Sequence, residues 1–215
     1  MNYGEIKQNL ISLGFAEESD YEEFEELGYT YDAINRSISS INTIFPAKVY
    51  YEFEVDNSED GRMEINLPSI DKDFLCFCDT PVLVARNEKE NNTYKEVTLY
   101  KKFSDYEIEE ENTIVIYAPS IHGNTNDSKL TWTFRVFYEK LPTTIDKDTA
   151  DSFVTELPLK CHHLIPLLAA YYLWLDDEPT KAAQYYNLYE QERNNILQKD
   201  NRPRAKVELP KEGVI

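Results

Sequence analysis

Residues 163–191 have the sequence HLIPLLAAYYLWLDDEPTKAAQYYNLYEQ. They belong to a segment rich in Leu, Ala and Tyr, which predicts a helix over about residues 159–175. Pro166 lies inside this segment and either kinks the helix or marks its true start. The acidic residues at 176–178 predict the start of a new helix, because carboxylates stabilise the first turn. A second helix follows over about residues 180–198, so the region predicts a helical hairpin.

The residues before this hairpin change from a helical period to a period of two. In Val49–Val55 the odd positions are apolar and the even positions carry Tyr or Glu, as in a half-buried strand. Similar segments lie near residues 62–67, 73–78, 81–86, 94–100, 113–118 and 131–138. Because no helical pattern separates them, these seven or so strands predict an antiparallel β-sandwich over residues 47–148, not a parallel α/β sheet.

Two of these segments carry more specific expectations. Ile114–Tyr117 is apolar throughout, which predicts a central strand. Trp132 lies in phase with Phe134 and Val136, which favours a place in the core. An exposed aromatic residue on a β-sandwich could instead stack on a sugar, and Trp132 is the best candidate for that role.

The N-terminal residues 1–46 predict two further helices. A short first helix ends near Gly14, and a second with one apolar face extends from about Thr30 to Phe45. Each needs a partner for its apolar face, so we expect both to pack against the hairpin of residues 149–200. The expected fold class is therefore α+β: a small helical bundle formed by the N- and C-terminal helices, with an inserted antiparallel β-sandwich.

The chain is acidic and shows no targeting segment. Its 215 residues include 22 Lys and Arg against 40 Asp and Glu, a formal net charge of −18. This balance argues against non-specific nucleic-acid binding, which needs a basic face to neutralise phosphates. The start of the chain carries no secretory signal, and Leu164–Leu175 is shorter than the roughly 20 apolar residues of a membrane span. We expect synthesis in the cytoplasm and no membrane partner.

The sequence carries no motif of a nucleotide enzyme or a serine hydrolase. Its six glycines form no phosphate-binding loop, and no GxSxG elbow is present. We therefore expect no enzyme activity, no catalytic residue and no cofactor.

The cysteines and histidines do not predict a metal site. Cys161, His162 and His163 are adjacent, and side chains of adjacent helical residues point about 100° apart, whereas zinc needs three or four converging ligands. We expect Cys161 to pack inward and the histidines to lie near a helix start or an interface. Cys76 and Cys78 share one face of a predicted strand and are expected to be buried free thiols.

Acidic clusters occur at residues 17–26, 107–111 and 176–178. None has the DxDxDG pattern of a calcium loop, so solvated faces are expected. The functional alternative is electrostatic, because an acidic wall repels DNA phosphates or meets a basic patch on a partner.

Two features suggest contacts with other proteins. Five of the sixteen tyrosines lie on the hairpin, at Tyr171, Tyr172, Tyr185, Tyr186 and Tyr189. Tyrosine suits both a core and a subunit interface, and both interpretations remain open at this point. Residues 201–215 carry four basic and two acidic residues with no helical period, which predicts an extended arm that orders against a partner. Its candidate contact residues are Arg202, Arg204 and Lys206.

The hairpin of residues 163–191 resembles the C-terminal hairpin of a group of virion proteins from tailed phages of Firmicutes and related hosts. The matching pieces are Tyr3–Ile6, the DAIN element Asp32–Asn35, Leu164–Asp177 and Ala182–Glu190. They cover both helical stretches, while the β block matches only in type.

This resemblance implies a head–tail adaptor of the virion neck. Such adaptors are similar in plan: a helical core docks beneath the portal, a β domain is inserted, and a terminal arm reaches a neighbour. They form rings, commonly of about twelve copies, around the DNA channel. The implied partners are the portal protein, other neck and tail proteins, and further copies of this chain, with passing DNA not specifically bound.

Two rival functions differ in class. One is another phage tail or baseplate structural protein whose β-sandwich binds carbohydrate, which requires exposed aromatic residues on the sandwich. The other is an enzyme or small-molecule binder, which requires a pocket with two converging carboxylates of shifted pKa.

Overall fold

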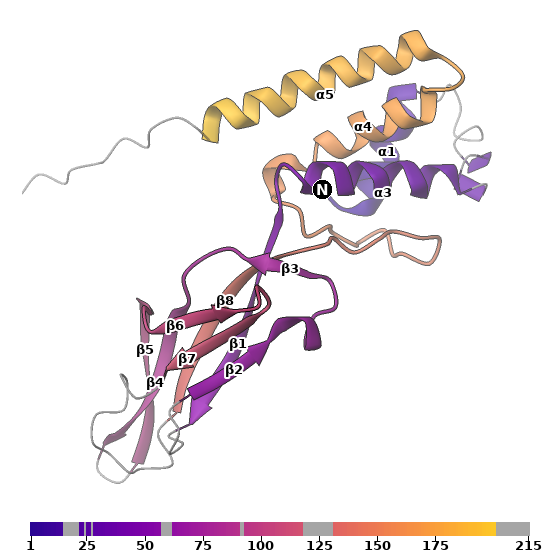
Figure 1. The fold of residues 1–215 in the computed structure, drawn as a ribbon. Helices are drawn as coiled ribbons and strands as arrows, with labels where there is room; N and C mark the ends of the chain where they lie inside the picture. The colour runs from indigo at the N-terminus through magenta and orange to yellow at the C-terminus, as the bar shows by residue number, and fades with distance from the viewer. Residues whose placement is uncertain are drawn as a thin grey trace, which may run out of the picture.

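The computed structural model describes residues 1–14, 22–23, 25–26, 28–56, 62–90, 93–117 and 131–200. In these residues the N- and C-terminal helices form one body, and the strands between them form a second (Figure 1). This arrangement confirms the expected α+β fold, a helical bundle with an inserted antiparallel β-sandwich.

The helical body is built around one apolar helix. Its helices are α1 (Tyr3–Gly14), α3 (Tyr29–Asn42), α4 (Leu164–Trp174) and α5 (Pro179–Asp200). α4 is apolar on almost every side and packs against α1, α3 and α5. A helix without a polar face is stable only when other elements surround it. α4 is therefore the centre of this body, and α5 lies along its outside (Figure 1).

Pro166 marks the start of α4 and does not kink it. It is the third residue of the helix, and the short 3₁₀ turn η3 (Leu159–Cys161) precedes it. In the first turn a backbone N–H has no partner within the helix, so proline removes no hydrogen bond there. The helix predicted from residue 159 therefore begins at Leu164.

α1 begins with a reciprocal cap and ends against α4. The Glu5 amide donates to Oδ1 of Asn2 at 2.8 Å, and the Asn2 amide donates to Oε2 of Glu5 at 2.9 Å. This is the pattern of a capping box. At the other end a methyl group on Gly14 would overlap the indole nitrogen of Trp174, and Lys181 donates to the Gly14 carbonyl at 3.0 Å. The missing side chain at Gly14 thus lets α1 approach α4.

The inserted body contains two antiparallel sheets. The larger contains β1 (Ala47–Asp56), β3 (Phe74–Phe77), β4 (Val82–Glu90), β5 (Thr93–Lys102) and β8 (Thr131–Lys140). The smaller contains β2 (Arg62–Asn66), β6 (Tyr106–Glu109) and β7 (Thr113–Tyr117). The strand orders are β1-β8-β4-β5, with β3 on β8, and β2-β7-β6. β7 is thus central in its sheet, as its apolar run predicts.

The two sheets share one apolar core. On β8 the inward residues are Trp132, Phe134, Val136 and Tyr138, none more than 5% exposed. The Phe134 ring lies 5.8 Å from that of Phe53 on β1, and Ile114 of β7 closes the core from the other sheet. The predicted alternation of β8 is confirmed, and Trp132 is a core residue that no sugar can reach.

Strand β6 was not expected. Residues 107–111 were expected to form a solvated acidic face, and Glu107, Glu110 and Glu111 are indeed exposed, but β6 pairs with β7 through the first of these residues. Glu107 accepts a hydrogen bond from Tyr117, and Glu109 accepts one from Arg62, both at 2.9 Å. These acids are therefore cross-strand partners in a sheet.

The expected burial of Cys76 and Cys78 is wrong. Cys76 is exposed and Cys78 is half-buried. The β3–β8 register shifts between Phe74 and Cys76, so Phe74 and Phe77 pack toward the core in place of the thiols. Partial burial and the nearby Glu139 carboxylate raise the pKa of Cys76, which keeps its thiol protonated at neutral pH.

A polar cluster joins the two bodies. At the end of α3, the Asn42 amide group donates to the Lys140 carbonyl at 3.3 Å, and its carbonyl oxygen accepts from the Ala47 amide at 2.7 Å. Nζ of Lys140 lies 3.7 Å from carboxylate oxygens of both Asp71 and Glu156. These contacts fix the places where β1 and β8 meet the helices. We call Lys140, Asp71 and Glu156 the joint cluster.

Candidate interaction surface

A row of tyrosine rings connects α4 and α5. Ring centroids lie 5.1 Å apart for Tyr172 and Tyr171, 5.0 Å for Tyr171 and Tyr186, and 5.9 Å for Tyr186 and Tyr189. Tilted rings at such separations attract one another beyond the area they bury. We call these four residues the tyrosine row.

A guanidinium lies at each end of the tyrosine row. Arg36 of α3 lies 4.3 Å from the ring centroid of Tyr172. At the other end Arg193 lies 5.9 Å from the Tyr189 ring and pairs with Glu190 at 2.6 Å. Cations over aromatic faces are favourable, so the row links three helices and ends in a charge on each side.

The exposure of these tyrosines separates the two interpretations left open by the sequence. Tyr189 is only 4% exposed and belongs to the helical core, whereas Tyr186 is 40% exposed. Tyr171, Tyr172 and Tyr185 are intermediate and pack against that core. Tyr186 is therefore the residue of this set that offers most of its ring to a partner.

The phenols of Tyr185, Tyr186 and Tyr189 are neutral at physiological pH. The negative charge of Glu190 raises the pKa of Tyr186, while burial raises the pKa of Tyr185 and of Tyr189. Tyrosine ionises near pH 10 without perturbation. These three tyrosines therefore contribute packing and hydrogen bonding, and no negative charge.

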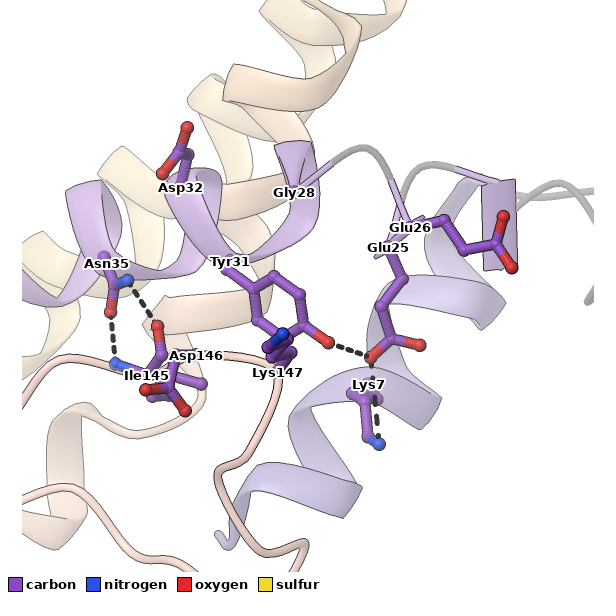
Figure 2. A pocket seen from close by; sticks show the side chains of 10 residues that line it. All are labelled: Lys7, Glu25, Glu26, Gly28, Tyr31, Asp32, Asn35, Ile145, Asp146 and Lys147. Carbon is purple, nitrogen blue, oxygen red and sulfur yellow. Dashed lines mark hydrogen bonds and ion pairs between the residues drawn. The ribbon is translucent and has the colours of Figure 1, made fainter.

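A shallow depression of about 780 Å³ lies beside α1 and α3 (Figure 2). One oxygen of Glu25 accepts a hydrogen bond from Tyr31 at 3.2 Å and lies 3.9 Å from Nζ of Lys7. The side-chain amide of Asn35 donates to the Ile145 carbonyl and accepts from the Ile145 amide, each at 2.8 Å. These polar groups bind one another. Their contacts hold α1, α3 and the segment after β8 together.

Glu25 differs from the solvated side chain that was expected in the first acidic cluster. It lies in the run at residues 17–26 that was predicted to be solvated, yet its side chain is only 26% exposed because it contacts Lys7 and two tyrosines. The rest of that run lies partly outside the described residues. The cluster at residues 176–178 is exposed, as predicted.

Metal ligands do not gather in the part of the chain that the structure describes. Cys161 is buried in the helical core, as expected. His162 is also buried; one ring nitrogen lies 2.7 Å from the Leu157 carbonyl and the other 3.1 Å from the amino group of Met1. The His163 side chain is 45% exposed. The two histidines thus flank the start of α4 in different surroundings.

The carboxylates of the joint cluster have shifted pKa values. Burial opposes the shift, but hydrogen bonds from the Asp73 backbone and the Tyr138 hydroxyl, with the charge of Lys140, lower the pKa of Asp71. Burial likewise opposes hydrogen bonds from Thr143 that lower the pKa of Glu156. In an acid–base pair one carboxyl has a raised pKa. Both of these stay ionised around Lys140, which indicates a structural role.

Comparison with models of known protein families and with curated proteins gives no match. No helix in the described ranges is both long and apolar enough to cross a membrane. The predicted arm residues Arg202, Arg204 and Lys206 lie outside the described residues, directly after the end of α5 at Asp200.

One contact of this surface had no signal in the sequence. Arg36 lies 136 positions before Tyr172 in the chain, and only the packing of α3 on α4 brings them together. The tyrosines, in contrast, were identifiable by their number and spacing.

Proposed function

We propose that this chain is a head–tail adaptor of a tailed-phage virion: a structural neck protein, without catalytic activity, that docks to the portal around the DNA channel. The observation that carries the proposal is the exposed Tyr186 at the surface of a rigid tyrosine row. A ring of identical subunits needs a heterologous contact, in which one surface binds a different surface of the next copy. An amphipathic aromatic residue held by its neighbours suits such a contact, because little side-chain freedom is lost on binding.

The charge distribution also supports this role. The chain as a whole carries a formal charge of −18, while its last fifteen residues carry an excess of basic residues. An acidic ring lets DNA pass without holding it. A basic arm with Arg202, Arg204 and Lys206 complements the acidic surface of a neighbouring copy or partner.

The test combines this protein with the portal protein encoded nearest to it. Negative-stain microscopy and native mass spectrometry should reveal a ring, of about twelve copies, on the portal. Persistent monomers that do not bind the portal would overturn the proposal.

Variants then test the surface itself. Tyr186→Ala should weaken ring formation by about 1–2 kcal/mol, roughly tenfold in affinity, while the protein stays folded. Gln191→Ala, at an exposed position on another side of α5, is the matched control and should leave assembly unchanged. Deletion of residues 201–215 should likewise weaken assembly and leave the fold intact. If the Tyr186→Ala variant and the truncated chain assembled as well as the Gln191→Ala control, neither Tyr186 nor the C-terminal arm would be an assembly contact.

A further inference from the structure

A second aromatic cluster lies on the outer face of the larger sheet. Tyr50 on β1 is 54% exposed and Tyr100 on β5 is 59% exposed. The guanidinium of Arg135 on β8 lies 4.1 Å from the ring centroid of Tyr50 and 5.4 Å from that of Tyr100. One cation thus holds two exposed rings in place across the sheet.

The strand register explains how this cluster forms. The inward residues of β1 occupy odd positions, so Tyr50 and Glu52 face away from the core. Glu52 is the cross-strand partner of Arg135, and its Oε1 accepts from Nε of Arg135 at 2.8 Å and from Nη2 at 2.5 Å. Both bonds end on the same oxygen. Among the described residues nothing donates to the second oxygen of Glu52, and this side chain is 39% exposed.

The backbone of Tyr100 is bent to point its ring at this cluster. The β4–β5 register pairs Leu83 with Lys101 but Ala85 with Thr98, which leaves an extra residue on β5 at this point. Tyr100 itself has a φ of 46°, a conformation that bulky residues rarely adopt. Bulges of this kind re-aim side chains and often occur beside binding sites. The sheet therefore keeps a large ring exposed where a regular strand would place it differently.

We propose that Tyr50, Tyr100, Arg135 and Glu52 form a carbohydrate-binding site for a neutral pyranose. The exposed rings offer apolar faces on which the C–H face of a sugar can stack. The free oxygen of Glu52 accepts a hydrogen bond from a sugar hydroxyl, and a guanidinium N–H of Arg135 can donate to one. The adjacent carboxylate and the strongly negative chain disfavour anionic polymers. This site takes the alternative role for which Trp132 was the best candidate in the sequence, and it does not depend on the proposed adaptor function.

The test is saturation-transfer NMR with the full chain and a panel of neutral oligosaccharides of glucose, galactose, mannose and N-acetylglucosamine. Heparin oligosaccharides serve as the anionic control. We expect saturable binding of at least one neutral oligosaccharide and none of heparin. Tyr50→Ala and Tyr100→Ala should each weaken this binding roughly three- to tenfold. Tyr50→Phe, which keeps the ring, should retain it.

Tyr29→Ala is the matched control, because Tyr29 is 56% exposed but lies on α3. It should bind sugar like the unaltered chain, and the melting temperature of each variant shows that it is folded. The proposal is overturned if no neutral oligosaccharide binds, or if binding is equal in the Tyr50→Ala and Tyr29→Ala variants. It is also overturned if the two sandwich substitutions weaken only the assembly of copies, because the cluster is then a protein contact.

Discussion

Gly14 lies where the end of α1 meets Trp174 of α4, and there is no room for a side chain between them. Gly14→Ala should destabilise the protein by about 1–3 kcal/mol, the usual cost of forcing extra atoms into a packed contact. Gly4→Ala is the control within the same helix. A methyl group there would meet Cβ of the exposed Asp151 at 3.2 Å, which requires a shift of only a few tenths of an ångström.

Urea unfolding of both variants checks this prediction. Alanine favours a helix over glycine by about 1 kcal/mol. This gain offsets the cost of the contact with Asp151, so Gly4→Ala should leave the free energy of unfolding almost unchanged. An equal loss of stability in the two variants would show that the contact with Trp174 does not limit the approach of α1.

Asn35 ties α3 to the segment that follows the sandwich, through its two hydrogen bonds to the Ile145 backbone. Asn35→Ala should cost about 1–3 kcal/mol, because it leaves the backbone groups of the buried Ile145 without partners. It should also speed hydrogen exchange of the Ile145 amide. Asp32→Ala, at an exposed position one turn earlier, should cost at most about 1 kcal/mol, for the loss of a first-turn carboxylate, and should leave exchange at Ile145 unchanged. Unchanged exchange at Ile145 in the Asn35 variant would contradict the assigned role.

Elements with one buried face were predictable from the sequence, including the edge strand β1, whereas the short edge strand β6 was not. β8 buries every second residue, so the alternation of apolar residues in its sequence identifies the side chains that enter the core. β6 lies at the edge of its sheet, and Ile108 on it is 47% exposed. Its pattern therefore carries little burial signal. The site divides in the same way: the tyrosine spacing was visible, whereas the contacts of Arg36 and the unusual backbone of Tyr100 depend on tertiary packing.

The core of the sandwich depends on the inward face of β8. Phe134 is fully buried and its ring contacts those of Phe53 and Phe103, at 5.8 and 5.0 Å between centroids. Phe134→Ala should cost about 3–5 kcal/mol, since it leaves a cavity and removes these contacts. Thr133→Ala, on the opposite face of the same strand, should cost much less. Circular dichroism during chemical unfolding measures both, and similar losses would contradict the assignment of faces.

At the scale of the whole molecule, the joint cluster makes the stability of the protein depend on pH. The pKa values of Asp71 and Glu156 are lowered from ordinary values of 3.8 and 4.5. A carboxyl group with a lowered folded-state pKa contributes stability that is complete above its unfolded pKa and is lost as pH falls through the folded value. The pKa of Tyr138, which donates to Asp71 at 2.8 Å, is raised to about 12, first by burial and then by this hydrogen bond. Its contribution is complete below about pH 10 and is lost as pH rises through about 12.

Lys140→Met separates this cluster from the other carboxylates. Removal of the cation should lower stability at pH 7, because two partly buried carboxylates lose their counter-ion. It should also reduce the stability lost between pH 7 and pH 3, since the pKa values of Asp71 and Glu156 then lie closer to their unfolded values. Lys48→Met, which removes an exposed cation paired with Glu139, should leave the pH profile almost unchanged. Urea unfolding across this pH range measures these effects. If stability falls with pH equally in Lys140→Met and in the unaltered chain, Lys140 does not lower the pKa values of Asp71 and Glu156.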